Sequence, residues 1–123
     1  MNRFIVISLL ACSLIFAQSA FCGDAVKKTV EGVYKEQAEL NGKIVQIHGK
    51  VVKVNNAIMK RNFLHIQDGT GGEGTNDITI TSDQTANIGD EVTVTGTVAL
   101  NRDFGFGYMY PILIEQSTIE KHK

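Results

Sequence analysis

Residues 43–54 read KIVQIHGKVVKV, and apolar and polar side chains alternate along much of this stretch. Val45, Ile47 and Val51 share one face of the expected strand with Gly49. Alternation with a period of two is typical of a β-strand that buries one face. A glycine inside a strand weakens it and is favoured where the strand must bend. This stretch therefore predicts a long, coiled strand that pairs with two neighbours in a small barrel.

Four further stretches predict strands. The alternation recurs at residues 63–67, 77–81 and 91–98, and a last strand is expected at 108–115. These segments are rich in threonine and valine, and turns of glycine, aspartate and asparagine separate them. Gly96 lies mid-strand and predicts a second bend. Together the five segments predict an all-β fold, a five-stranded Greek-key barrel of the OB-fold type.

A short helix is expected before the first strand, in residues 29–40. Val30 and Val33 recur at helical spacing, and an Asn-Gly pair follows the segment as a stop. Either Asp24 or Thr29 could cap the first turn.

The first residues have the order of a secretory signal peptide. Arg3 supplies a positive charge, residues 4–17 are almost all apolar, and small and polar residues follow. The apolar run is shorter than the roughly 20 residues that span a bilayer. We expect residues 1–22 to be a signal peptide and residues 23–123 to be a single OB-fold domain, periplasmic or secreted, with no transmembrane span after cleavage. The alternative is a lipid-anchored lipoprotein, for which Cys12 or Cys22 would carry the lipid.

Charge is unevenly distributed along the chain. The chain holds 12 basic and 13 acidic residues, and loss of residues 1–22 removes only Arg3, which leaves a net charge of −2. Residues 40–67 contain basic side chains and no acid, whereas Arg102 is the one basic residue within 68–103. Such a basic stretch occurs in nucleic-acid-binding proteins and also on ordinary solvated strands. At most one cysteine survives cleavage, so an internal disulfide is excluded.

The glycine-rich segment DGTGGEG, at residues 68–74, has two interpretations. A phosphate-binding loop needs a helix after the glycines and commonly a lysine, but a strand follows here and no lysine occurs. A turn capped by Asp68, with glycines at positive φ, explains the segment better. We predict a corner of the barrel.

Four motifs carry a resemblance to a known family: GKVVKV at 49–54, NFLHIQDGTGG at 62–72, GDEVTVTGTVAL at 89–100 and DFGFGYMYPILIE at 103–115. With them the chain resembles a group of exported bacterial OB-fold proteins. Some members are named DNA-binding proteins, and some are associated with nitrite-reductase gene clusters. The resemblance implies the fold and export but no particular activity. The family pattern has glycine where this chain has Lys60, and tryptophan where it has Phe63. The Asp-x-x-Gly turn that begins at Asp68 is also distantly similar to OB domains that bind tRNA anticodons.

The outer face of the first three strands is the expected contact surface, because OB-folds commonly bind ligands there. On this face an aromatic ring would stack on a ligand, and polar side chains would donate or accept hydrogen bonds. Residues 102–110, which join the last two strands, contain Phe104 and Phe106, and we expect one of them to plug the barrel end. The candidate ligand-binding residues are His48, Lys50, Phe63, His65, Gln67 and Tyr108.

Two functions remain open at this point. Catalytic motifs and spaced metal ligands are absent from the sequence, so we expect no enzyme, no metal and no cofactor. The first hypothesis is a binding module for an envelope protein or a small ligand. The alternative is a protein that binds single-stranded nucleic acid. The oligomeric state is left open.

Overall fold

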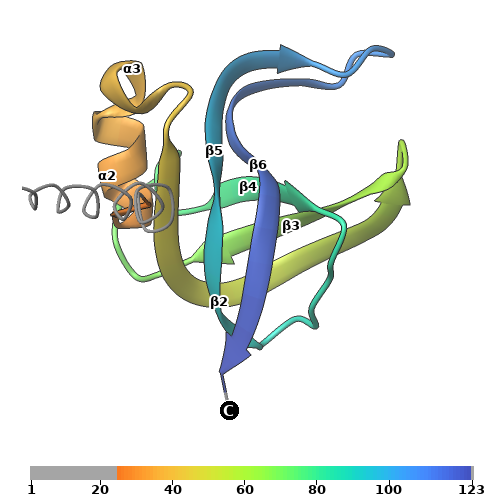
Figure 1. Cartoon of the computed structure of the whole chain (residues 1–123), viewed down its shortest axis with the longest axis horizontal. Helices are drawn as coiled ribbons and strands as arrows, with labels where there is room; N and C mark the ends of the chain where they lie inside the picture. Colours follow the sequence, from red (N-terminus) through yellow and green to blue (C-terminus); the bar gives the residue numbers. More distant parts are fainter. Residues whose placement is uncertain (1–24, 123) are drawn as a thin grey trace, which may run out of the picture.

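The structure, a computed structural model, describes residues 25–122 and is mostly β-sheet (Figure 1). The expected signal peptide, residues 1–22, lies outside the described residues. The elements are β1 (Val26–Lys27), α2 (Val30–Lys35), α3 (Gln37–Leu40), β2 (Ile44–Ile58), β3 (Arg61–Gln67), β4 (Ile78–Ser82), β5 (Glu91–Asp103) and β6 (Met109–His122). No helix within residues 25–122 is long and apolar enough to cross a membrane.

The sheet closes on itself. Strands follow the order β2–β3–β4–β6–β5, and β5 pairs again with β2. All of these pairs are antiparallel except β4 with β6, which is parallel. This is the five-stranded Greek-key arrangement of an OB-fold, so the predicted fold class is confirmed.

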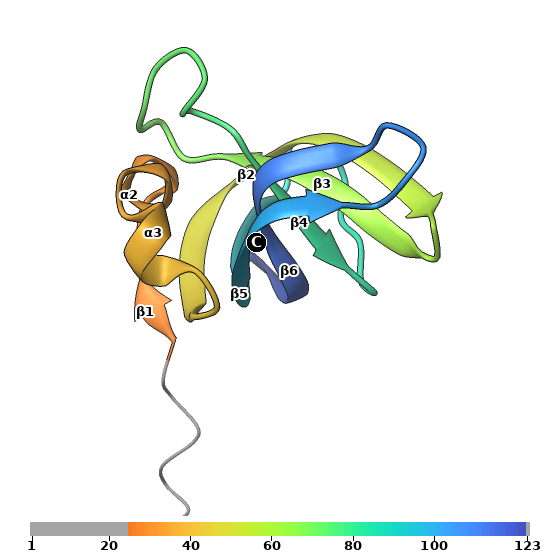
Figure 2. The same ribbon diagram turned by 90° about the horizontal axis from the view of Figure 1, so that it is seen from above.

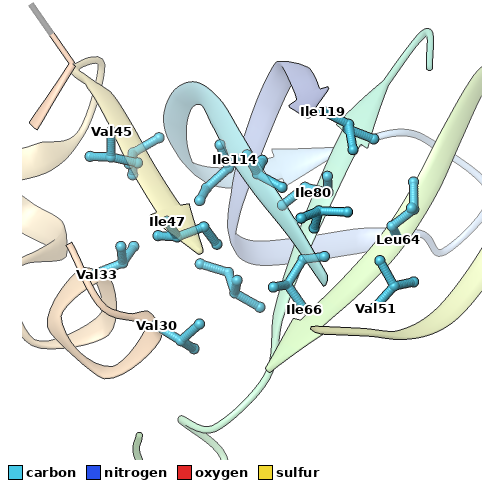
Figure 3. Close-up of a cluster of buried hydrophobic side chains, with 14 of the residues drawn as sticks. Val30, Val33, Val45, Ile47, Val51, Leu64, Ile66, Ile80, Ile114 and Ile119 are labelled. Atoms are coloured by element: carbon cyan, nitrogen blue, oxygen red, sulfur yellow. The ribbon is translucent and has the colours of Figure 1, made fainter. Parts of the chain in front are cut away.

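The core is aliphatic and draws on every strand of the barrel. Ile47, Ile66 and Ile80 have relative exposures of 1% or less, and Ile114 is fully buried (Figure 3). These residues follow the alternation that one buried face of a strand requires. The helices lie at one side of the sheet (Figure 2). From there Val30 contributes its side chain to the same cluster (Figure 3).

Two mid-strand glycines let the strands cross closely. A Cβ atom on Gly49 would lie 2.6 Å from the backbone oxygen of Gln67, and one on Gly96 would lie 2.8 Å from that of Glu115. Both distances are shorter than real Cβ contacts, so a side chain cannot fit without a backbone shift. The expectation that these glycines mark places where the strand bends therefore has a steric basis.

Two hairpins extend beyond the barrel, away from the helices (Figure 1). The first predicted strand ended at residue 54, but β2 continues to Ile58 and turns through Met59 and Lys60. Both turn residues have positive φ, 53° and 68°, as in a type I′ hairpin turn. Similarly, β5 and β6 stay paired as far as Asp103 and Met109, which is longer than predicted.

An irregularity at Val52 changes the register between β2 and β3. Val51 pairs with Ile66, but Lys53 lies opposite His65, so Val52 has no partner on β3. Because β2 gains one residue there, the side chains beyond it shift by one position relative to β3.

Candidate functional site

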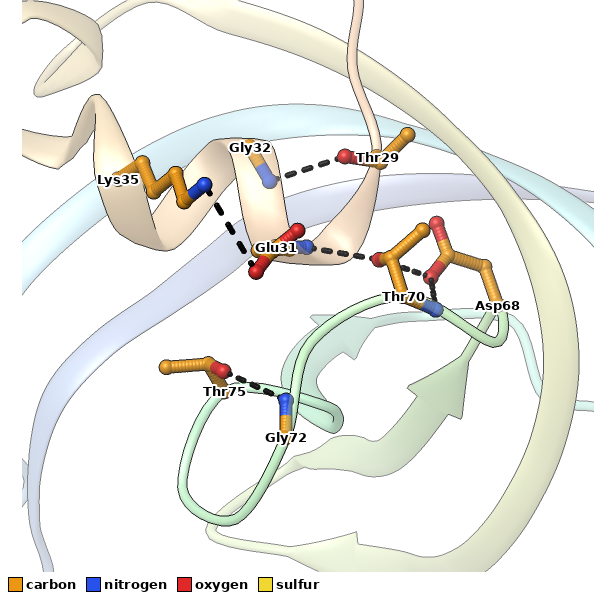
Figure 4. Close-up of polar contacts among 8 residues, drawn as sticks. All are labelled: Thr29, Glu31, Gly32, Lys35, Asp68, Thr70, Gly72 and Thr75. Carbon is orange, nitrogen blue, oxygen red and sulfur yellow. Dashed lines mark hydrogen bonds and ion pairs between the residues drawn. The ribbon is translucent and has the colours of Figure 1, made fainter.

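The segment DGTGG forms the expected turn, which also caps the helix. The Asp68 carboxylate accepts hydrogen bonds from the backbone N–H of Thr70 at 3.0 Å and of Val30 at 2.9 Å. The Thr70 hydroxyl donates to Asp68 and accepts from the N–H of Glu31 at 3.0 Å (Figure 4). Gly69 and Gly71 have positive φ. The segment thus joins a corner of the barrel to the first turn of α2.

These contacts stabilise the charged form of the Asp68 carboxyl group. Burial raises the pKa of Asp68, but hydrogen bonds from Thr70 and from the backbone N–H of Val30 outweigh that effect and hold the pKa below its ordinary value. Thr29 supplies the local cap, because its hydroxyl accepts from the N–H of Gly32 at 2.9 Å. The first turn of α2 is thus capped twice, by Thr29 and by the turn that contains Asp68 and Thr70. This indicates a structural role for the DGTGG turn.

Phe63 was predicted to face outward as a stacking ring, and this prediction is wrong. Its relative exposure is 3%. The ring packs edge-on against Phe104, with centroids 5.4 Å apart, and against Tyr110 at 5.6 Å. The long β5–β6 hairpin brings Phe104 onto the face of β3 that would otherwise be open. Phe63 therefore packs beneath Phe104, and its ring is too buried to stack on a ligand.

His65 lies on the outer face of β3, where its side chain contacts Asp77. Its Nδ1 is 2.8 Å from Asp77 Oδ1, and both side chains are partly buried. The Tyr34 hydroxyl donates to the backbone oxygen of Asp77 at 2.6 Å. Burial, followed by the charge of Asp77, raises the pKa of Tyr34 above its ordinary value. This group ties β3 and the loop before β4 to α2.

Three of the predicted residues do lie together. His48, Lys50 and Gln67 line a shallow cavity of about 310 Å³ with Asp68 and Glu91. Phe63, His65 and Tyr108 do not line it. In addition, the ring centroids of His48 and His122 are 5.0 Å apart. Among residues 25–122, no group of three or more histidine, cysteine or acidic side chains is placed to hold a metal.

A larger groove of about 510 Å³ lies between the two hairpins. Lys60 and Arg61 line it from the β2–β3 hairpin, and Arg102 lines it from β5. Residues 81–84 and 115–118 complete it along the line where β4 meets β6. We call this cavity the hairpin groove. In OB-folds, the loops that correspond to these two hairpin ends border the ligand site.

Side chains hold the floor of the hairpin groove together. β4 and β6 pair at only two positions, so few backbone hydrogen bonds join them. Ser82 Oγ donates to the Ser117 carbonyl at 2.5 Å. The Gln84 side chain accepts from the N–H of Ile119 at 2.8 Å and donates to its carbonyl at 3.4 Å. The Asn62 amide donates to the Gln84 carbonyl at 3.0 Å, which fastens the β2–β3 hairpin to the end of β4.

Phe104 contacts two of the cationic side chains that line the hairpin groove. The Cζ atoms of Arg61 and Arg102 each lie 5.1 Å from the centroid of its ring, within cation–π range. Arg102 Nε is 2.7 Å from Glu115 Oε2, although its N–H does not point at that oxygen. Phe104 or Phe106 was expected to plug the barrel end, but the partly buried Phe104 ring packs on Phe63 of β3 instead, and Phe106 is 95% exposed.

Tyr108 is half exposed on the same hairpin, as a contact residue requires. Tyr108 does not line the hairpin groove, and the charged residues that do were absent from the predicted site, namely Lys60, Arg61, Asp83, Arg102 and Glu115. A usable signal was present in the sequence, because basic residues occur in both segments that border an OB-fold groove.

Comparison with known proteins identifies the fold but no family. No protein-family model matches the chain, and no curated protein is significantly similar to it. Among solved structures it is similar to OBody AM3L09 bound to hen egg-white lysozyme, with 16% identity, a TM-score of 0.50, and coverage of 68% of this chain and 84% of that one. OBody AM2EP06, also bound to hen egg-white lysozyme, gives 17% identity, a TM-score of 0.50, and coverage of 68% and 82%.

A third similar structure is described as an aspartyl-tRNA synthetase from Leishmania major Friedlin. The identity is 16% and the TM-score 0.57, and the match covers 85% of this chain but only 22% of the synthetase. At identities of 16–17%, these similarities show the fold alone. They agree with the OB-fold strand order described above.

Proposed function

We propose that this protein is an exported, non-catalytic binding module that holds an envelope protein or a small ligand in the hairpin groove. The observation that carries the proposal is the groove itself, about 510 Å³ in volume, at the side of an OB-fold where ligands commonly bind. Side-chain hydrogen bonds from Ser82, Gln84 and Asn62 fix its floor. A preformed floor lowers the cost of ordering the site when a ligand binds.

The chemistry offered by the groove suits binding. Its lining consists of hydroxyl, amide, cationic and carboxylate side chains. These groups orient a ligand through hydrogen bonds and charge. The OB-fold of OBody AM3L09 is bound to lysozyme, so the fold can present a protein-binding surface. Export to the periplasm or the medium is supported by the signal-like order of residues 1–22.

Site-specific photo-crosslinking tests this proposal. A photoreactive amino acid replaces Thr118, which is exposed and lines the groove, in the full chain expressed in cells. The control position is Lys35, whose side chain is 71% exposed on α2, away from both hairpins. We expect a discrete adduct, or a retained ligand by native mass spectrometry, for position 118 alone. Equal labelling at both positions, or no ligand in either experiment, contradicts the proposal.

One observation favours the second candidate function, binding of single-stranded nucleic acid. Such proteins combine cations that neutralise phosphates with aromatic side chains that stack on bases. Phe104 with Arg61 and Arg102, and the half-exposed Tyr108, are of this kind. Titration with a short mixed-sequence single-stranded oligonucleotide distinguishes the two functions. Saturable binding that weakens steeply with salt supports nucleic acid. An unchanged amide spectrum excludes it.

A further inference from the structure

The two hairpins bring three cations to one end of the hairpin groove. Lys60 and Arg61 come from the β2–β3 hairpin, and Arg102 comes from β5, about forty residues later in the chain. Of these, only Arg102 forms an ion pair with another residue in the part of the chain that the structure describes. Two cations therefore face the groove without a neutralising side chain.

Two of the three cations, Arg61 and Arg102, contact neighbouring side chains that restrain them. Glu115 pairs with Arg102, and the Phe104 ring lies against both Arg61 and Arg102. Phe104 is itself packed against Phe63 and Tyr110. A guanidinium group that is already restrained loses less conformational entropy when it binds a ligand.

The hairpin that carries Lys60 and Arg61 is also fixed. The Asn62 side chain accepts from the N–H of Ala57 at 2.9 Å, across the hairpin, and its amide donates to the Gln84 carbonyl at 3.0 Å. The turn at Lys60 has the left-handed φ of 68° that a tight hairpin requires. These contacts hold the backbone that carries Lys60 and Arg61 in place beside the groove floor.

We propose that this end of the hairpin groove is a recognition site for a single oxyanion, a carboxylate or a phosphate group, of the ligand. The inference rests on the proposed binding function and adds the chemical class of the ligand. Planar guanidinium groups match the two oxygens of such an anion. The groove also contains Asp83 and Glu115, so its three cations leave a net charge of +1. This balance suits one anionic group better than a polyphosphate chain.

Small probes test the site directly in the purified protein. Benzoate and phenyl phosphate provide the two oxyanions, and benzamide is the neutral control. We expect saturable NMR shifts at the Nε–H groups of Arg61 and Arg102 and at the amide of Phe104, with dissociation constants in the millimolar range. The probe that binds more tightly identifies the oxyanion, since the two share the same charge-assisted hydrogen bonds.

Variants test whether the arginine is responsible. R61Q should weaken binding of the preferred probe by about tenfold, as expected for loss of one charge-assisted contact. R61K, which keeps the charge but loses the planar fork, should be intermediate. Lys53→Gln removes an equal charge from the part of β2 opposite His65, outside the groove lining, and should bind like the wild type. An unchanged amide spectrum confirms that each variant is folded.

Three results overturn the inference: equal shifts with the neutral probe, shifts scattered over the surface, or normal binding by R61Q. Absence of any probe binding also overturns it, and the crosslinking experiment then separates two cases. An adduct at position 118 leaves the binding function standing with a ligand of different chemistry. Loss of both the adduct and the probe shifts removes the proposed function as well.

Discussion

Replacing Asp68 with alanine should destabilise the domain by about 2 kcal/mol, because it removes the anchor between the barrel corner and α2. The carboxylate accepts the N–H of Val30 at 2.9 Å and that of Thr70 at 3.0 Å, and it orients the hydroxyl that accepts the N–H of Glu31. Val30 is fully buried, so its N–H would lose its acceptor away from bulk water. An orphaned donor costs about 1–3 kcal/mol, and loss of a helix cap costs about 0.5–2 kcal/mol. These costs overlap and Asp68 is partly solvated, so we take a value near the middle.

Chemical denaturation followed by circular dichroism measures this change. For a domain of this size, about 2 kcal/mol corresponds to a fall in Tm of roughly 10 °C. Asp83→Ala is the matched control, because the hydrogen bonds described for Asp83 use its backbone oxygen and its side chain is exposed. A loss below about 0.5 kcal/mol for D68A, or an equal loss for both variants, would refute the reasoning.

The pH dependence of stability provides an independent test of the same contacts. The pKa of Asp68 is lowered in the folded state, so the unfolded chain binds the proton first as the pH falls. Its contribution is therefore present above the unfolded value of about 3.9 and is lost as the pH falls through the lower folded value. D68N should show a smaller loss of stability than the wild type over that acidic range. Identical slopes would mean that the carboxylate is not selectively stabilised.

Three further changes test the fold. Gly49→Ala should cost about 2 kcal/mol or more in denaturation experiments, since the new Cβ would lie 2.6 Å from a backbone oxygen of β3, whereas Gly72→Ala, with open space around it, should change stability by less than about 0.5 kcal/mol. Lys60→Gly should raise stability by roughly 0.5–1 kcal/mol, because it relieves a left-handed φ; a loss would show that the lysine side chain stabilises the turn. Tyr34→Phe should cost about 1 kcal/mol through loss of the 2.6 Å hydrogen bond to Asp77, and an unchanged denaturation midpoint would contradict that bond.

Much of the barrel could be predicted because its signals are local. Val45, Ile47 and Val51 alternate with polar residues, and all three are buried as expected. The position of Gly49 predicted a bend, and the structure shows the close strand crossing that requires it. The ends of the strands were less predictable. β2 and β3 continue to the turn at Met59 and Lys60. Both residues have positive φ, but neither is a glycine, so the sequence does not indicate the turn.

The site was harder to predict because it depends on which hairpins meet. Alternation placed Phe63 on the outer face of β3, and the prediction of exposure followed from that face alone. The chain then covers this face with Phe104, from a hairpin about forty residues away. Conversely, Arg61 and Arg102 are about forty positions apart in the sequence, yet the Cζ atom of each lies 5.1 Å from the centroid of the Phe104 ring.

Sequence patterns alone predicted the all-β OB-fold, a short helical segment before the first long strand and the structural role of the DGTGG turn. These features follow from periodicity, glycine positions and short-range hydrogen bonds, all of which act between neighbours in the chain. Only the tertiary structure decided that Asp68 caps α2 from 38 positions away and that the hairpin groove gathers its cations. Such contacts depend on strand register, and one extra residue at Val52 is enough to change which side chains meet.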